Sequence, residues 1–187
     1  MAAQEDTQQA FFFRAVDALE RANLPYAITG SWASTAYGMP RTTHDLDVIV
    51  AIRVEHVAVL VSAFPPPFYA DAEWMSAAAA LGEFFNIIDP ILGLKIDFWP
   101  LKNDEYSRAQ FDRRRQVDVL GRAVWMLTPE DVILSKLLWY KMSASDLQMR
   151  DIVSVWKAQQ GKLDLDYLRL WAARLSVADL FSKVTSS

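Results

Sequence analysis

The chain has 187 residues, a length that fits one domain or one domain with a small appendage. It is 52% apolar and 12% aromatic, which excludes a disordered composition, and no apolar run reaches the ~18 residues of a membrane helix. The formal net charge of −4 argues against a large nucleic-acid footprint, and the lack of cysteine excludes disulfides, zinc–thiolate sites and thiol catalysis.

The first elements in chain order alternate between helices and strands. Residues 7–23 carry apolar side chains at helical spacing, and Gly38 and Pro40 stop a short helix that follows the first strand. Pro65–Pro67 stop another helix. The pattern predicts helices at 7–23, 31–37, 54–64 and 71–81, and strands at 26–29 and 44–52.

The second half of the chain changes from strands to helices. Residues 84–88 and 94–99 are expected to form a hairpin, and 104–112, 116–120 and 123–127 a helix and two short strands. Thr128 then provides an N-cap, with proline at the first helical position and acids in the first turn. Helices are predicted at 129–142, 145–159, 164–174 and 177–184. We therefore predict a core at 1–127 and a helical C-terminal subdomain at 128–187.

Two carboxylates fall on one face of the second predicted strand. Asp45 and Asp47 are two residues apart, so they project side by side while Leu46 and Val48 enter the core. Such a pair is costly unless a cation lies between the two side chains, and Mg²⁺ prefers oxygen ligands of this kind. The alternative is an edge strand with two solvated acids.

A third acid fits the same arrangement. In residues 94–99, Lys95, Asp97 and Trp99 alternate with apolar residues. If this strand pairs beside the Asp45–Asp47 strand, Asp97 completes the carboxylate set of two-metal phosphoryl chemistry. The alternative is an exposed aspartate on a half-buried strand.

These residues resemble a known superfamily when they are read in order. Gly30-Ser31, a spacer of thirteen residues, Asp45-Leu46-Asp47 and then Asp97 between apolar neighbours are similar to the DNA polymerase beta-type nucleotidyltransferases. The sequence pattern from Arg41 to Asp47 is most similar to that of small bacterial members, namely the aminoglycoside and lincosamide nucleotidyltransferases and the abortive-infection toxin type. The resemblance implies an α+β fold in which a mixed sheet with flanking helices is followed by a helical subdomain.

The resemblance also implies an activity and roles for particular residues. A member of this superfamily transfers a nucleoside monophosphate from a nucleoside triphosphate such as ATP to a hydroxyl, using two Mg²⁺ ions. Asp45 and Asp47 would bridge the metals, and Asp97 would hold the metal nearest the acceptor and accept its proton. Gly30 lets the backbone approach phosphate, and Ser31 can donate its hydroxyl and N–H.

Two cations are candidates for contact with the phosphates. Arg41 precedes the first acid by four residues and could clamp phosphate oxygens, or it is a surface cation in a loop. Lys136 could reach the triphosphate from the helix that begins at Pro129, or it is a lysine whose stem covers apolar surface.

Other side chains have a structural and a functional interpretation. Trp139 and Tyr140 could stack a base or belong to the core. The cluster at 113–115, with Arg108 and Arg122, is either a solvated helix end or a phosphate-binding patch. The spacing of Asp146, Arg150 and Asp151 suggests ion pairs along one helix, without a catalytic role.

Two functions remain open from the sequence. The chain is either an active nucleotidyltransferase or a non-catalytic relative that binds nucleotide or a partner protein, as in a toxin–antitoxin system. The acceptor could be a small molecule, an RNA end or a protein hydroxyl, and neither the preferred base nor the oligomeric state can be read. Because the N-terminus lacks the pattern of a secretory signal, we expect a cytoplasmic protein without a membrane partner.

Overall fold

A six-stranded mixed sheet forms the centre of the molecule in a computed structural model that describes residues 2–186. Its strand order is β3-β4-β2-β1-β6-β5. The β2–β4 and β1–β6 pairs are parallel, and the other neighbours are antiparallel. The strands are β1 Tyr26–Thr29, β2 Asp45–Val50, β3 Phe85–Asp89, β4 Leu94–Pro100, β5 Arg115–Val119 and β6 Arg122–Met126. The predicted α+β class with a mixed sheet is confirmed.

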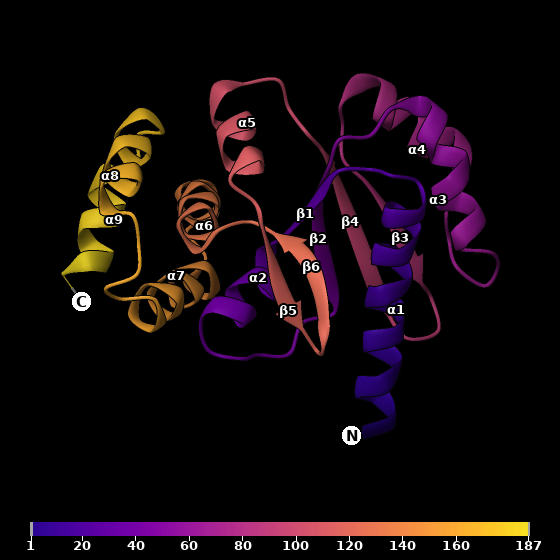
Figure 1. Cartoon of the computed structure of the whole chain (residues 1–187), viewed down its shortest axis with the longest axis horizontal. Helices are drawn as coiled ribbons and strands as arrows, with labels where there is room; N and C mark the ends of the chain where they lie inside the picture. Colours follow the sequence, from indigo (N-terminus) through magenta and orange to yellow (C-terminus); the bar gives the residue numbers. More distant parts are fainter. Residues whose placement is uncertain (1, 187) are drawn as a thin grey trace.

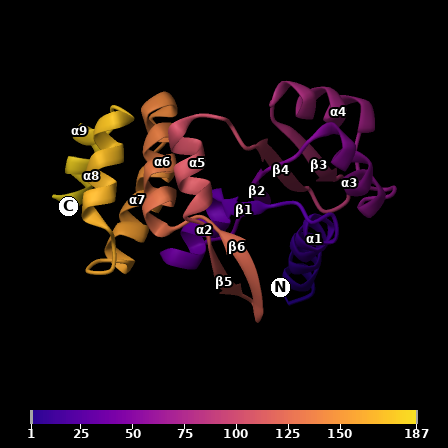
Figure 2. The same ribbon diagram turned by 45° about the horizontal axis from the view of Figure 1, so that its top comes forward.

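Helices surround this sheet in two groups (Figure 1). The N-terminal helices α1, α3 and α4 lie on one side of the sheet, and α6–α9 form a bundle on the other, an arrangement that Figure 2 also shows. The helices are α1 Ala2–Arg21, α2 Gly30–Tyr37, α3 Val57–Ala63, α4 Ala72–Leu81, α5 Glu105–Asp112, α6 Pro129–Ser143, α7 Asp146–Ala158, α8 Leu165–Arg174 and α9 Ala178–Thr185. None of the helices within residues 2–186 has both the length and the apolarity to cross a membrane.

Alternation along the strands builds the core as predicted. Leu46, Val48 and Val50 of β2 are buried, and so are Ile96 and Phe98 of β4. The intervening residues therefore face the opposite side of the sheet, where α2, α6 and α7 contact one another. This face is the one that carries the acidic side chains.

The first C-terminal helix, α6, begins with the N-cap that the sequence predicted. The Thr128 hydroxyl accepts a hydrogen bond from the Asp131 N–H at 3.3 Å, and Pro129 occupies the first turn of α6. The helix predicted over residues 54–64 is divided in the structure into a 3₁₀ turn, η1 (Val54–His56), and the helix α3. The 3₁₀ turn forms because the Arg53 N–H donates a hydrogen bond to Nδ1 of His56 at 3.1 Å. The domain boundary at Thr128 stays a prediction.

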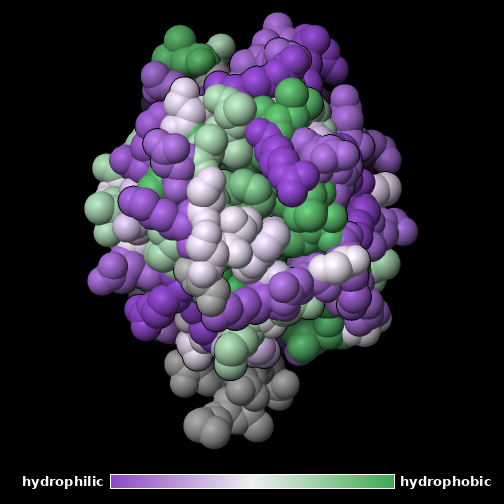
Figure 3. Space-filling view, turned by 90° about the vertical axis from the view of Figure 1, so that its left-hand side faces the viewer, coloured by the Kyte–Doolittle hydropathy of each residue, from purple (hydrophilic) through white to green (hydrophobic). Residues whose placement is uncertain are grey.

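The outer face of the C-terminal helices is mixed in polarity. Figure 3 shows apolar residues near the middle of this face, with hydrophilic residues around them. Exposed leucines on these helices include Leu147, Leu165 and Leu170.

Candidate active site

The three predicted acids meet where β2 and β4 run side by side. In this parallel pair Asp47 lies opposite Asp97, and Asp45 lies opposite Lys95. Asp45 is exposed, Asp47 is half-buried, and Asp97 is only 6% exposed. The predicted pairing of the two strands is confirmed, and it brings the carboxylates to one face of the sheet.

Lys95 lies among these carboxylates, a feature to which the sequence analysis gave no role. Its Nζ is 2.8 Å from Oδ2 of Asp97 and 4.0 Å from Oδ1 of Asp45. The signal was available, because strand alternation already placed Lys95 and Asp97 on one face. The protein therefore supplies its own cation to part of the acidic cluster.

The electrostatics of the cluster reflect both burial and mutual repulsion. Burial raises the pKa of Asp47 and of Asp97, and neighbouring carboxylates add to this effect. Burial alone would lower the pKa of Lys95, but its hydrogen bond to Asp97 and the acidic charges raise it. Without a further cation, the negative charges of Asp47 and Asp97 are only partly compensated.

The donor set fits a hard divalent cation. Oδ1 of Asp97 is buried and has no hydrogen-bond partner, so one carboxylate oxygen is left for a ligand. Among residues 2–186 no group of three acids or histidines is already arranged as a metal site. Asp45, Asp47 and Asp97 can therefore hold Mg²⁺ only if their side chains adjust, and Lys95, which contacts Oδ2 of Asp97, competes with the ion for that carboxylate.

Gly30 begins α2 directly against this cluster. Its φ is +61°, and a Cβ added there would lie 2.0 Å from Oδ2 of Asp47. Only glycine fits, because the backbone conformation and the close carboxylate both exclude a side chain. Thr29, the N-cap of α2, makes no side-chain capping bond, so N–H groups of the first turn remain for an anion.

Arg41 reaches the same turn from the loop before β2. It donates to the hydroxyl of Ser31, and its Nε and Nη2 lie 3.0 Å from Oδ1 and Oδ2 of Asp151. The guanidinium is thus held by a two-pronged ion pair with α7. Arg41 lies on the same side of the sheet as Gly30 and the acids, as the phosphate-binding prediction requires.

Lys136 joins the same ion-pair network from α6. Its Nζ is 2.8 Å from Oδ2 of Asp151 and 3.0 Å from Oε1 of Gln148, and the residue is only 4% exposed. Burial lowers the pKa of Lys136 although Asp151 opposes the shift, and the lysine charge also acts on Asp47. Lys136 therefore lies close to the carboxylates and is not a surface lysine.

Asp151 is the functional candidate that the sequence analysis missed. It was expected to pair along its own helix, but it bonds to Arg41 and Lys136 and accepts from the Ser34 hydroxyl at 3.3 Å. Burial would raise the pKa of Asp151, but the two cations outweigh that effect and lower it. Helical spacing predicts only local pairs, and nothing in it signals a partner 110 residues away.

Replacing Asp151 with asparagine should destabilise the protein by about 3 kcal/mol, because it leaves Lys136 buried without its counterion. Urea unfolding near neutral pH measures the change. Since the folded pKa of Asp151 lies below the unfolded value of about 3.9, its contribution is present above that pH and is lost as pH falls through the folded pKa. The difference between wild type and variant should therefore shrink below about pH 4.

Asp146→Asn is the matched control, because Asp146 is exposed in the first turn of the same helix. Its loss should cost less than about 1 kcal/mol, the usual limit for an exposed charge at a helix end. Equal costs for the two variants would contradict the network role of Asp151.

Three aromatic side chains, those of Phe84, Trp99 and Trp139, form a group that contacts the carboxylate of Asp47 through Trp99. The Trp99 Nε1–H donates to Oδ1 of Asp47 at 3.3 Å. The Trp99 ring lies 4.8 Å from the Phe84 ring and 5.7 Å from the Trp139 ring, in an edge contact with the latter. Trp139 of α6 is 45% exposed, and it also borders an open hollow of about 500 Å³ with Leu138 and Met142.

The arginine cluster around residue 113 is tied into the fold. Arg113 lies 3.6 Å from carboxylate oxygens of both Glu130 and Asp131 and 3.8 Å from the Tyr167 ring. Arg114 and Arg115 lie over aromatic rings, and Arg122 pairs with Asp17 and Glu20. These contacts favour the structural interpretation of the cluster over a phosphate-binding patch.

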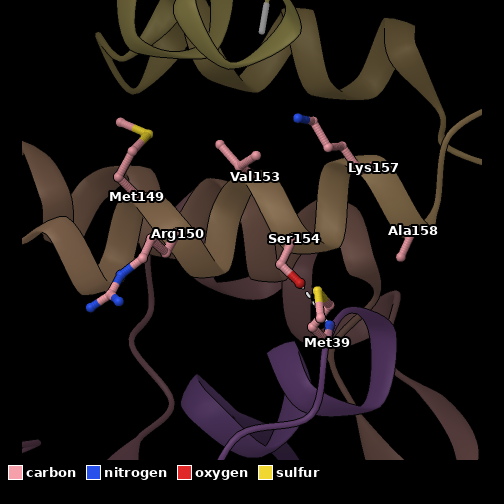
Figure 4. Close-up of a pocket in the computed structure, with 7 residues that line it drawn as sticks. All are labelled: Met39, Met149, Arg150, Val153, Ser154, Lys157 and Ala158. Atoms are coloured by element: carbon pink, nitrogen blue, oxygen red, sulfur yellow. Dashed lines mark hydrogen bonds between the residues drawn. The ribbon is translucent and has the colours of Figure 1, made fainter.

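A hollow of about 580 Å³ lies along α7, where residues of this helix and Met39 line it (Figure 4). In Figure 4 Ser154 points toward Met39, whose N–H donates to the serine hydroxyl at 2.6 Å, while Val153 and Lys157 point toward the neighbouring helices. None of the predicted metal-binding and phosphate-binding residues lines this hollow; these residues are Gly30, Ser31, Arg41, Asp45, Asp47, Asp97 and Lys136.

Comparisons with known proteins place the fold. No family model matches the chain, and no curated protein matches it. An antigenic nucleotidyltransferase-like protein from Paracoccidioides brasiliensis is similar in structure, with a TM-score of 0.55, 20% identity and coverage of 93% of this chain and 91% of that chain.

An antibiotic-resistance factor and an antibiotic adenylyltransferase are similar in structure as well. The antibiotic-resistance factor ANT(2'')-Ia gives a TM-score of 0.59 at 17% identity, covering 97% of this chain and 99% of that chain. The lincosamide antibiotic adenylyltransferase LnuA gives 0.52 at 13% identity, covering 77% of this chain and 93% of that chain. The chain therefore has the nucleotidyltransferase fold.

Proposed function

We propose that the chain is a Mg²⁺-dependent nucleotidyltransferase that moves a nucleoside monophosphate from a nucleoside triphosphate to a hydroxyl of an acceptor. The observation that carries the proposal is the placement of Asp47 opposite Asp97 on parallel strands, directly against the Gly30 turn. The shared fold with ANT(2'')-Ia and LnuA supports the same reaction class.

The reaction assigns a role to each carboxylate. The hydroxyl oxygen of the acceptor forms a bond to the α-phosphorus, and the bond from that phosphorus to the pyrophosphate oxygen breaks. Bound Mg²⁺ would lower the pKa of the hydroxyl and offset charge on the leaving oxygens. Asp45 and Asp47 would hold the metals, and Asp97 would be a ligand on the acceptor side. In that position Asp97 would also be the carboxylate that accepts the hydroxyl proton.

The remaining site residues would bind the phosphates. The first N–H groups of α2 have no side-chain cap and would bind an anion, and Ser31 adds a hydroxyl. Glycine at position 30 lets this turn lie directly against the Asp47 carboxylate. Arg41 and Lys136 supply positive charge, and Asp151 holds both cations toward this turn. The network around Asp151 is therefore a device that positions the cations before the nucleotide arrives.

Lys95 provides a test of the metal assignment. Lys95→Gln should raise the affinity of the nucleotide-free protein for Mg²⁺ about 10-fold, because a charged hydrogen bond worth about 1.5 kcal/mol no longer competes with the ion. Isothermal titration calorimetry measures the affinity. Lys102→Gln is the control, since Lys102 is exposed just beyond β4. An affinity that Lys95→Gln leaves unchanged would count against a metal at Asp97.

The alternative is a non-catalytic relative that binds nucleotide or a partner protein, such as an antitoxin-like component of a toxin–antitoxin system, and one observation favours it. Lys95 already contacts Asp97, so a cation other than a metal could satisfy that acid permanently. Titration of ATP with and without Mg²⁺ separates the two functions. An active site of this design should bind ATP only with the metal, whereas equal binding in EDTA would favour the alternative.

A further inference from the structure

The aromatic border beside the carboxylates has one open ring. Trp99 is fixed by Asp47 at its Nε1 and by the Phe84 ring. Trp139 contacts Trp99 through a single edge contact and leaves 45% of its surface to solvent. An exposed tryptophan beside a cluster of carboxylates is a platform on which a planar ring can stack.

The position of Trp139 on α6 relates this platform to the phosphate-binding cations. Lys136 and Trp139 are three residues apart, so they are neighbours on one helix face and are separated by about 4.5 Å along its axis. Burial raises the pKa of Asp47 and the charge of Lys136 opposes that rise, so the two side chains lie near each other. Trp99 donates a hydrogen bond to Asp47 and also contacts the Trp139 ring. A nucleotide whose phosphates lie at Lys136, beside the carboxylate of Asp47, can therefore extend its other end to Trp139.

We propose that Trp139, supported by Trp99, stacks the base of the nucleoside triphosphate. The proposal rests on the proposed function, and it assigns the nucleoside end of the donor to α6. Stacking uses the π face that every base has, so ATP and GTP should bind with similar affinity.

The test compares a ligand that has a base with one that lacks it. Calorimetry in Mg²⁺ measures the affinities of ATP and of inorganic tripolyphosphate for the wild type, Trp139→Ala and Trp139→Phe. Trp74→Ala is the matched control, because Trp74 is a tryptophan of similar exposure, 40%, on α4. Thermal melting of each variant checks that it is folded.

The expected result is a selective loss. Trp139→Ala should weaken ATP about 5- to 150-fold, the range that corresponds to about 1–3 kcal/mol for base–aromatic stacking, and leave tripolyphosphate unchanged. Trp139→Phe should restore most of the ATP affinity, and Trp74→Ala should match the wild type.

Three results would overturn the proposal. Unchanged ATP affinity in Trp139→Ala would mean that the ring does not contact the base. Equal weakening of ATP and tripolyphosphate would make Trp139 part of the phosphate site. If neither ligand binds the wild type, the proposed function itself fails, and the base site fails with it.

Discussion

Asp47→Asn is expected to lower the affinity of the protein for Mg²⁺ by at least about 100-fold and to abolish nucleotide transfer. Residues that only support a metal ligand cost about 10- to 100-fold when they are replaced, and Asp47 is proposed to be a ligand itself. Asparagine keeps an oxygen that accepts the Trp99 hydrogen bond, so the fold should persist. Calorimetric titration with Mg²⁺ and transfer assays measure the two losses.

The same variant should keep or slightly gain stability without metal. Burial raises the folded pKa of Asp47 above its unfolded value, so its ionised form destabilises the fold at neutral pH. This penalty shrinks as pH falls below the folded pKa and is gone below the unfolded value of about 3.9, and the advantage of the variant should disappear with it. Asp166→Asn, at an exposed surface carboxylate, controls for the change in charge. Loss of thermal stability with unaltered Mg²⁺ affinity would contradict the metal role.

Gly30→Ala should lower nucleotide transfer about 100-fold, because a misplacement of about 1 Å near a reacting centre can cost that much. The added Cβ would lie 2.0 Å from Oδ2 and 2.7 Å from Cγ of Asp47, so the carboxylate must move. The variant should also unfold more easily, since an L-residue with positive φ costs about 1–2 kcal/mol before any collision. Transfer assays and urea unfolding give the two numbers.

Gly82→Ala isolates the backbone effect from the collision. Gly82 has a φ of +68°, and a Cβ there would meet nothing within 4 Å. The control should show the backbone cost alone, about 1–2 kcal/mol, with normal transfer. If both variants lost stability equally and both transferred normally, the close contact of Gly30 with Asp47 would have no functional meaning.

Local sequence patterns predicted most of the helices and strands of the fold. Alternation in β2 and β4 predicted which side chains enter the core, and Thr128 with Pro129 predicted the start of α6. The split of residues 54–64 was missed, because it depends on a single side-chain cap from His56 to Arg53. Helix and strand periodicity contains no information on such a contact.

The parts of the candidate site that lie on strands could be predicted from the sequence. The parts that depend on how helices pack together could not. The acids follow from a two-residue spacing and one strand pairing. The role of Asp151 could not be predicted without knowing that α7 packs against α2. The two helices are so close that a Cβ on Gly38 would lie 2.5 Å from the Ser154 hydroxyl. Arg113 likewise takes its partners from the first turn of α6 and the ring of Tyr167 in α8, so a run of three arginines in the sequence is not a patch in space.

The position of the transferred phosphorus tests the central claim most directly. The protein, Mg²⁺ and cell extract are incubated in parallel with ATP labelled at the α-phosphate and at the γ-phosphate, and the labelled species are separated. We predict that only the α label enters an acceptor, that the γ label leaves as pyrophosphate, and that Asp97→Asn abolishes the transfer. Entry of the γ label, or no labelled acceptor with any of the four nucleoside triphosphates, would contradict the assignment of this site to nucleotidyl transfer.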